Sequence, residues 1–300
     1  MIAVISHDAG GAEILSSYVQ KQGVEAFLYT LEGPAENIFR RKLGDVNRQS
    51  LQVAVHQSTS ILCGTSWQAD IEFNAIKMAR SLGKRSISFV DHWINYQDRF
   101  IRSNELVLPD EIWVGDAMAL AMAKEVFPST PVVLIDNPYV QDIRQEFAAL
   151  QMSRSPSINS ISVLYLCEPV SEHALLRHGS KHFWGYVEED ALRYFLSNLS
   201  VLGSAIDRIV IRAHPSEKAG KYSWVEREFD LPIEMGGQRT LVEEIVDCDL
   251  AVGCESMAMV VALMAGKKVI TCIPPGGRAC VLPHDGIISL QHLIENDCNK

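Results

Sequence analysis

A turn that combines glycines with polar side chains follows the first short apolar run of the chain. Residues 6–13 read SHDAGGAE, which places Gly10 and Gly11 where a strand is expected to lead into a helix. Glycines let the backbone approach a ligand closely, and free N–H groups at a helix N-terminus favour an anion or a sugar hydroxyl. We therefore predict substrate contacts from Gly10, Gly11 and Glu13. The full G-x-G-x-x-G spacing is absent, which argues against a dinucleotide, and the alternative is that the glycines only make the turn.

Asp8 stands in the same turn, at the carboxyl end of the expected first strand. Open α/β sheets bind ligands at that edge, so Asp8 is a candidate general base for an acceptor hydroxyl. The alternative is that Asp8 only caps the following helix.

A second polar loop follows another expected strand. Residues 89–100 read FVDHWINYQDRF and bring together an acid, an imidazole, an amide and aromatic rings. A carboxylate beside an imidazole can relay a proton, so Asp91 and His92 are catalytic candidates, and an indole offers a flat face to a sugar ring. We predict that Trp93 and Asn95 bind substrate. In the alternative interpretation, the aromatic side chains anchor the loop to the core and His92 is an ordinary polar residue.

The second half contains a basic turn after an apolar run. Residues 212–217 read RAHPSE, and a proline at this point suits the first turn of a helix. An imidazole can donate to a phosphate or carboxylate, with a neighbouring cation supplying positive potential. We predict substrate contacts from Arg212, His214 and Ser216, against the alternative of a stray histidine at a strand end.

A further strand-to-helix turn lies within DLAVGCESMA, residues 249–258. A glutamate there can accept hydrogen bonds from ribose hydroxyls, and a serine with nearby backbone N–H groups can hold a phosphate. Gly253, Glu255 and Ser256 are therefore predicted to bind substrate. Helix capping is the alternative for the glutamate and the serine.

Short apolar runs alternate with longer amphipathic segments along the chain, which is typical of βαβ units around parallel sheets. In the first half we expect strands at 2–6, 25–29, 60–63, 86–90, 111–114 and 131–135, and helices at 11–22, 34–43, 69–82 and 116–126. In the second half we expect strands at 161–166, 207–212, 249–252 and 268–272, and helices at 184–199, 216–228, 239–247 and 254–265.

The length of 300 residues exceeds what one hydrophobic core ordinarily supports. Between Asp136 and Asn159 the pattern weakens into a polar stretch, and a new buried strand begins at Ile161. We therefore predict two α/β domains, residues 1–137 and 138–300.

Composition narrows the function classes. The net charge of −10 argues against a nucleic-acid partner, whose phosphates need a basic face. The seven cysteines include no C-x-x-C pair, and H-E-x-x-H is absent, so we expect reduced structural thiols, no metal and no cofactor. Residues 1–6 lack the features of a signal peptide, which predicts a cytoplasmic protein with possible peripheral membrane contact. A basic cluster is interpreted as a solvated helix face or as a contact for a phosphate or an acidic acceptor; it consists of Arg177, His178, Lys181 and His182.

The motifs His214-Pro215 and Glu255-Ser256 resemble those of the GT-B superfamily of glycosyltransferases, most closely the bacterial sialyltransferases, polysialyltransferases and capsule-polysaccharide transferases. The resemblance implies two Rossmann-like domains with parallel sheets facing a central cleft. It implies an N-terminal acceptor domain and a C-terminal nucleotide-sugar donor domain. His214 and the serine turn would hold the donor phosphate, and transfer would be metal-independent and inverting, with an N-terminal acid as base. The turn here has one serine beside Glu255 instead of the serine pair of those families.

We therefore predict a glycosyltransferase that moves a sugar from a nucleotide-sugar donor, CMP- or UDP-linked, to a glycan or other hydroxyl acceptor. Two alternatives stay open: a nucleotide-sugar 2-epimerase or hydrolase, and a non-catalytic sugar-nucleotide binding protein. Asp8 and Asp91 both stay candidates for the base.

Overall fold

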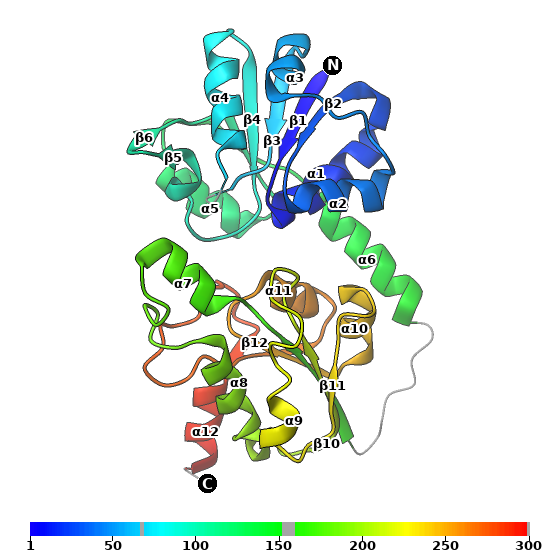
Figure 1. Cartoon of the computed structure of the whole chain (residues 1–300), viewed down its shortest axis with the longest axis vertical. Coiled ribbons are helices and arrows are strands. Elements are labelled where there is room, and N and C mark those ends of the chain that lie inside the picture. The colour runs from blue at the N-terminus through cyan, green and yellow to red at the C-terminus, as the bar shows by residue number, and fades with distance from the viewer. Residues whose placement is uncertain (67–68, 152–159, 299–300) are drawn as a thin grey trace. The chain divides into compact units, whose positions relative to one another are not determined.

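Two α/β units make up the chain in the computed structural model, which describes residues 1–66, 69–151 and 160–298. The units are Met1–Asp142 and Ile143–Lys300. Each unit contains its own six-stranded sheet and its own hydrophobic core (Figure 1). In the described part of the chain, no helix combines the length and the hydrophobicity needed to cross a lipid bilayer.

The sheet of the first unit is parallel throughout and has the order β2-β1-β3-β4-β7-β8. Its strands are β1 (Ile2–Ser6), β2 (Phe27–Leu31), β3 (Ser60–Cys63), β4 (Arg85–Val90), β7 (Glu111–Val114) and β8 (Val132–Leu134). The chain leaves β1 toward one edge of the sheet and later returns to build β3 on the other side. The strand order therefore reverses between β1 and β3, and ligands of open α/β sheets bind at the carboxyl ends of such strands.

Helices connect these strands, and four of the helices pack in two pairs. They are α1 (Ala9–Gln22), α2 (Pro34–Leu43), α3 (Leu51–Gln57), α4 (Ile71–Ser81) and α5 (Ala117–Val126). Helix α1 packs against α2, and α3 packs against α4. A short antiparallel pair, β5 (Ile101–Arg102) and β6 (Glu105–Leu106), follows the 3-10 turn Gln97–Phe100. Buried residues of β1 and β2, including Val4 and Tyr29, form the core with the inner faces of α1 and α2.

The second unit also has a parallel sheet, with the order β11-β10-β9-β12-β13-β14. Its strands are β9 (Ser160–Leu166), β10 (Ala205–Arg212), β11 (Ile233–Met235), β12 (Leu250–Gly253), β13 (Lys268–Thr271) and β14 (Ile287–Ser289). Counted within the unit, this order is 3-2-1-4-5-6, the order of the Rossmann fold. The reversal lies between β9 and β12, whose last residues Leu166 and Gly253 are register partners.

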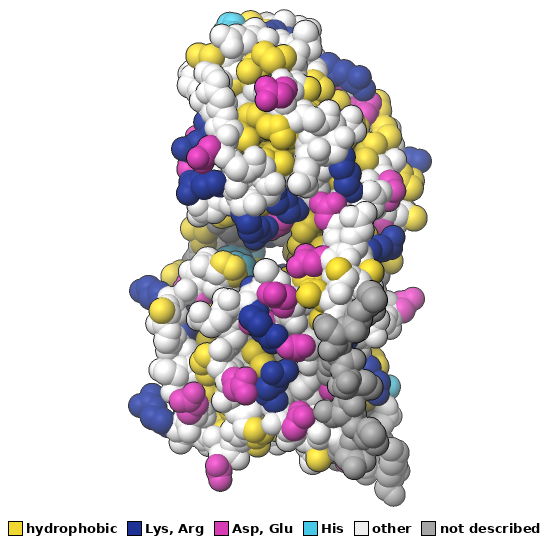
Figure 2. Space-filling model, turned by 90° about the vertical axis from the view of Figure 1, so that its right-hand side faces the viewer, with side chains coloured by type: hydrophobic (Ala, Val, Ile, Leu, Met, Phe, Trp, Pro, Cys, Tyr) yellow, Lys and Arg dark blue, Asp and Glu magenta, His cyan; other side chains and the backbone are white. Residues whose placement is uncertain are grey.

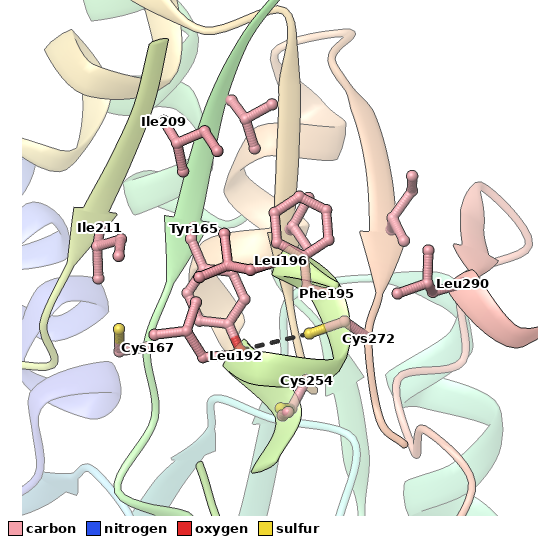
Figure 3. Close-up of a cluster of buried hydrophobic side chains, with 14 of the residues drawn as sticks. Tyr165, Cys167, Leu192, Phe195, Leu196, Ile209, Ile211, Cys254, Cys272 and Leu290 are labelled. Carbon is pink, nitrogen blue, oxygen red and sulfur yellow. Dashed lines mark hydrogen bonds between the residues drawn. The ribbon is translucent and has the colours of Figure 1, made fainter. Parts of the chain in front are cut away.

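The helices of the second unit are α7 (Val170–His178), α8 (Glu188–Leu196), α9 (Val225–Glu228), α10 (Leu241–Asp247), α11 (Met257–Met264) and α12 (Leu290–Cys298). Helix α8 packs Leu192 and Phe195 over the sheet (Figure 3). Beneath them lie thiols from three strand ends, and Cys272 contacts the hydroxyl of Tyr165 with Sγ and Oη 3.4 Å apart. The six cysteines whose side chains the structure describes form no disulfide.

The prediction of two Rossmann-like α/β domains is confirmed, but several predicted elements differ. The polar stretch after Asp136 contains helix α6 (Pro138–Gln151), and the division between the units falls inside it; residues 152–159 lie outside the described residues. Proline at the first position of α6 is compatible with a helix start. The sequence pattern also missed α3, α7 and α12 and the short strands β11 and β14.

The helix predicted at 216–228 is wrong over most of its length. Only Val225–Glu228 is α-helical, and the residues before it form turns. Gly220 has φ +78°, a left-handed backbone conformation that a continuous helix does not allow. The basic turn at His214 therefore leads into an irregular segment instead of a long helix.

Candidate functional site

The carboxyl ends of β1 and β4 bring two predicted site residues together. A Cβ atom added at Gly10 would overlap Oδ2 of Asp91 and lie 3.0 Å from its Cγ. Gly10 is the second residue of α1 and Asp91 follows β4, so both lie at the edge expected for ligands. Glycine at position 10 is therefore what allows the carboxylate to lie against the first turn.

Asp91 forms a buried ion pair with Arg99. Nη1 of Arg99 donates to Oδ1 of Asp91 at 2.7 Å, and the two side chains are only 7% and 10% exposed. Thr65 completes the cluster, since its hydroxyl accepts from Nη1 of Arg99 at 2.7 Å and donates to Oδ1 of Asp91 at 3.3 Å. Oδ1 of Asp91 thus accepts hydrogen bonds from both Arg99 and Thr65, and this carboxylate holds the loop after β4 in place. The sequence offered Arg99 in the same loop, but nothing in the pattern indicated this pairing.

Asp8 has a different environment. It occupies the N-cap position of α1 without making a side-chain cap hydrogen bond. Its Oδ1 lies 2.7 Å from Nδ1 of His7, and both side chains are about a quarter exposed. The side chain therefore pairs with an imidazole at the ligand edge instead of capping the helix. His7, which the sequence analysis did not single out, is the second member of this pair.

Glu72 on α4 contacts the backbone of His7, next to the His7–Asp8 pair. Its buried carboxylate accepts a hydrogen bond from the backbone N–H of His7, with Oε1 at 2.7 Å. Burial, together with the negative charge of Asp8, raises the pKa of Glu72 to about 7, although hydrogen bonds from backbone N–H groups oppose the shift. On the other side, Nε2 of His7 lies 2.6 Å from where a Cβ of Gly33 would be, and Gly33 has φ +56°. His7 is therefore held between two loops and a helix.

Gly11 and Glu13 both contact other elements of the first unit. A Cβ at Gly11 would lie 3.1 Å from Cα of Gly64, so the glycine lets the start of α1 approach the end of β3. The carboxylate of Glu13 forms ion pairs with Arg41 and, at 3.1 Å, with Lys42 of α2. That these two residues bind substrate stays a prediction.

The loop after Asp91 is anchored by its aromatic side chain. Trp93 is buried and donates from Nε1 to Oδ2 of Asp116 at 3.0 Å. The backbone N–H of Trp93 donates to Nδ1 of His92 at 3.0 Å, and Asn95 adopts φ +58°. The burial of Trp93 favours the anchoring interpretation over a sugar-stacking face.

In the second unit, the loops after β9 and β12 diverge at the reversal of strand order. A Cβ at Gly253 would lie 2.9 Å from the carbonyl oxygen of Leu166 and 3.0 Å from Sδ of Met259. The glycine therefore permits the close packing of β12 against β9 and α11. A reversal of strand order of this kind is the position at which doubly wound sheets bind their ligands.

Three charged side chains meet beside the ends of β9 and β12. The backbone N–H of Glu255 donates to Oε2 of Glu168 at 2.7 Å, and Oε1 of Glu255 pairs with the guanidinium of Arg278. Burial raises the pKa of Glu168 to about 8, an effect that a hydrogen bond from the backbone of Cys254 and the positive charge of Arg278 oppose. Oε2 of Glu255 and Nε of Arg278 are buried and have no hydrogen-bond partner among the described residues. These atoms are a buried acceptor and a buried donor without a partner, whereas buried polar groups are ordinarily paired.

The sequence analysis missed Glu168 and Arg278. Glu168 follows the buried strand β9 and could have been found by searching the end of each strand for polar side chains. Arg278 comes from the distant loop after β13, and its position gives no sequence signal. Beside it opens a cavity of about 360 Å³; its lining is Thr271, Ile273, Gly277, Arg278, Ala279, Cys280, Leu282, Ile287, Ser289 and Gln291.

Ser256 is the N-cap of α11. Its hydroxyl accepts from the backbone N–H of Ala258 at 3.2 Å, which is the capping role that the sequence left open. The backbone N–H of Met259 donates to the carbonyl oxygen of Ser256 at 2.9 Å, so two N–H groups of this first turn have partners within the chain.

Nδ1 of His214 faces Ser216. It lies 2.8 Å from the Ser216 hydroxyl oxygen and accepts from the backbone N–H of Ser216 at 3.2 Å. Because an amide can only donate, the second contact favours the tautomer with the ring proton on Nε2. Burial lowers the pKa of His214, which favours the neutral ring. The imidazole therefore offers an Nε2–H donor while its other nitrogen is held by the turn.

Glu217 fixes the His214 turn to the rest of the unit. Its Oε2 accepts the backbone N–H of His214 at 2.8 Å, and its Oε1 accepts from Lys221 at 2.8 Å and from Tyr222 at 2.7 Å. Lys221 also pairs with Glu188. The basic turn is thus held by a network of buried charges.

Arg212 belongs to a separate pair. Its Nη1 donates to Oε2 of Glu244 at 2.7 Å and to the carbonyl oxygen of Arg239 at 3.0 Å. The carboxylate of Glu244 is buried, so Arg212 neutralises it. A role of Arg212 in substrate binding stays a prediction.

Comparison with known proteins gives matches in structure only. No protein-family model matches the chain, and no curated protein matches its sequence. The UDP-GlcNAc 2-epimerase from Neisseria meningitidis, solved bound to UDP-GlcNAc, superposes with a TM-score of 0.62 at 10% identity, covering 99% of this chain and 90% of that one.

Two transferases are also similar. The glycosyltransferase of kitacinnamycin gives a TM-score of 0.55 at 11% identity, covering 96% of this chain and 85% of that one. The α/β-galactoside α-2,3-sialyltransferase from Photobacterium phosphoreum gives 0.50 at 8% identity, covering 97% of this chain and 98% of that one. At such identities the likeness concerns the fold, and the resemblance expected from the two sequence motifs is confirmed at that level: the chain has the fold of GT-B glycosyltransferases and UDP-GlcNAc 2-epimerases.

Proposed function

We propose that the chain is a glycosyltransferase whose second domain binds a nucleotide-sugar donor and whose first domain supplies the base that activates an acceptor hydroxyl. The observation that carries the proposal is a pair of buried atoms without a partner among the described residues, Oε2 of Glu255 and Nε of Arg278. A ribose hydroxyl would donate to the first and accept from the second, so a nucleoside suits this position.

The donor phosphate would lie near two sources of positive potential. One is the imidazole of His214, whose Nδ1 accepts from the backbone N–H of Ser216. The other is the positive end of the α11 helix dipole, at Ser256. A phosphate that leaves as an anion would gain stabilisation from both, because such donors favour the developing charge over the bound diester.

Asp8 is our proposed base. The carboxylate of Asp91 already has Arg99 and Thr65 as partners, whereas Asp8 is partly exposed beside His7. In the reaction, the acceptor oxygen forms a bond to the anomeric carbon while the bond from that carbon to the phosphate oxygen breaks. The leaving phosphate keeps the electron pair, and the acceptor proton passes to Asp8. A single displacement of this kind inverts the anomeric centre.

The structural neighbours support the choice of substrate class, since one was solved bound to UDP-GlcNAc and two are named as transferases. They do not separate transfer from epimerisation. Assays therefore have to detect both products.

The test begins with thermal stabilisation by CMP, CDP, UDP and GDP, measured for wild type, His214→Ala and Glu255→Gln. Glu234→Gln, an exposed change on β11, is the matched control. We expect one nucleotide to stabilise wild type and the control and to have little effect on the two site variants. Equal stabilisation of all four proteins would contradict the assignment of His214 and Glu255 to the nucleotide site.

The corresponding nucleotide sugars are then incubated with hydroxyl acceptors and followed by NMR. A new glycosidic linkage of inverted configuration is the expected product. Formation of a 2-epimer without an acceptor would show that the protein is an epimerase, and formation of free sugar would show that it is a hydrolase. Nucleotide binding that survives in Asp8→Ala, with no product from wild type, would indicate a non-catalytic binding protein.

A further inference from the structure

The end of α7 and the turn that follows it expose large apolar side chains. Helix α7 buries Val170 and Ala174 against the second unit. On its outer side Leu175 is 46% exposed and Leu176 is 67% exposed, and Phe183 in the following turn is 55% exposed. Apolar side chains gathered on one surface mark a site of interaction more often than single exposed ones do.

The same segment is basic within an acidic protein. Arg177 and Lys181 lie between these apolar residues with His178 and His182, and no Asp or Glu occurs from residue 173 to residue 187. On the face of the molecule drawn in Figure 2, by contrast, acidic and basic side chains are interspersed. A segment without acids is thus set apart in a chain of net charge −10.

Ring stacking holds this turn in one shape. The rings of His178 and Phe183 stack with centroids 3.6 Å apart and planes at 11°, and the ring of Trp184 lies 5.8 Å from His178. The guanidinium of Arg278 lies 4.2 Å from the Trp184 ring centroid. Gly179 ends α7 in the left-handed conformation, with φ +73°, and so reverses the chain toward Phe183. The apolar side chains are therefore presented from an ordered turn.

We propose that this surface docks on an anionic lipid bilayer. The α7 surface consists of Leu175, Leu176, Arg177, Lys181, His182 and Phe183. Its leucines and phenylalanine would enter the boundary between headgroups and acyl chains, and its cations would meet the lipid phosphates. Charge complementarity favours an anionic bilayer as the occupant. The cations of this surface would be attracted to such a membrane, whereas the rest of the chain, with its net negative charge, would be repelled by it. The inference does not depend on the proposed transferase activity.

Sedimentation of the full chain with lipid vesicles tests the proposal. Wild type is expected to bind vesicles of phosphatidylcholine mixed with phosphatidylglycerol, to bind pure phosphatidylcholine more weakly, and to release as salt is raised. Leu176→Glu combined with Phe183→Glu should weaken binding by roughly tenfold or more, since both apolar insertion and charge are lost. Lys181→Glu should weaken it less and reduce its salt dependence.

Met235→Glu, at a 44% exposed position on β11, serves as the matched control and should bind as wild type does. Circular dichroism establishes that each variant is folded. The proposal is overturned if wild type ignores anionic vesicles, or if the Leu176/Phe183 variant binds them equally well. It is also overturned if the same variant only converts a dimer to a monomer in sedimentation velocity, because the surface would then bind a second copy.

Discussion

The carboxylate of Asp91 fills the space that a side chain at Gly10 would need. This relationship joins the first turn of the chain to a loop that follows the fourth strand of the sheet. Gly10→Ala is therefore expected to destabilise the protein by about 1–3 kcal/mol through overpacking. Urea unfolding measures the change.

A double-mutant cycle with Asp91→Ala is the control for this prediction. The cost of Gly10→Ala should shrink once the Asp91 side chain is gone. Equal costs in both backgrounds would mean that the steric conflict lies elsewhere.

Arg99→Met should be more damaging than Gly10→Ala, because it leaves the buried carboxylate of Asp91 without its cation. Breaking a buried ion pair in this way costs about 3–5 kcal/mol. Urea midpoints of Arg99→Met and of the exposed control Arg227→Met provide the comparison. A loss no greater than that of the control would show that solvent reaches Asp91.

Glu72 should make stability depend on pH. Its pKa rises from 4.5 to about 7 on folding, so the folded chain holds the proton more tightly than the unfolded chain does. The resulting stabilisation is fully present below pH 4.5 and is lost as pH rises to about 7. It amounts to roughly 3 kcal/mol at about 1.4 kcal/mol per pKa unit.

Glu72→Gln keeps an acceptor for the N–H of His7 and removes the titration. Between pH 4.5 and 7 the stability of wild type should therefore fall relative to that of Glu72→Gln. Urea midpoints across this range test the prediction, and parallel curves for the two proteins would refute it.

Asp8→Asn should lower kcat for sugar transfer by about 10²–10⁴-fold if Asp8 is the base. Nucleotide affinity, measured by calorimetry, should stay near that of wild type, because Asp8 and the donor site belong to different domains. His7→Asn is expected to give a smaller loss, since the carboxylate remains. An undiminished kcat in Asp8→Asn would move the role of base to another residue.

Glu255→Ala should weaken nucleotide binding by about 1.5–3 kcal/mol, or roughly tenfold to a hundredfold, the value of a hydrogen bond to a charged group. Calorimetric titration against the control Glu234→Ala measures this. A deoxyribose nucleotide should lose affinity for wild type and little for Glu255→Ala. Equal losses in both proteins would exclude a ribose contact at Glu255.

The alternation of apolar strands with amphipathic helices was sufficient to predict two parallel α/β domains, because strand and helix periodicity are local properties. The short edge strands β11 and β14 escaped notice since three residues carry little periodicity. The prediction of a long helix after His214 was wrong because the pattern of apolar residues carries no information on backbone dihedral angles, and Gly220 adopts a positive φ.

For the candidate site, the sequence pattern placed four residues after the carboxyl ends of strands, as the structure does: Asp8, Asp91, His214 and Glu255. Their partners were not predictable, because a pairing such as that of Glu255 with Arg278 joins loops from different strands. Local sequence also could not tell that Trp93 is buried against Asp116 or that Ser256 caps α11. Only the packed structure decides which polar groups already have partners.

The distribution of thiols also allows the two domains to be followed separately during unfolding. Among the described residues, the first unit has one cysteine, the buried Cys63, whereas four buried cysteines belong to the second unit: Cys167, Cys248, Cys254 and Cys272. A thiol inside a closed core reacts with an alkylating reagent only when that core opens. Pulse alkylation read by mass spectrometry would therefore report, in native buffer and without any introduced label, whether the two cores open together or one before the other.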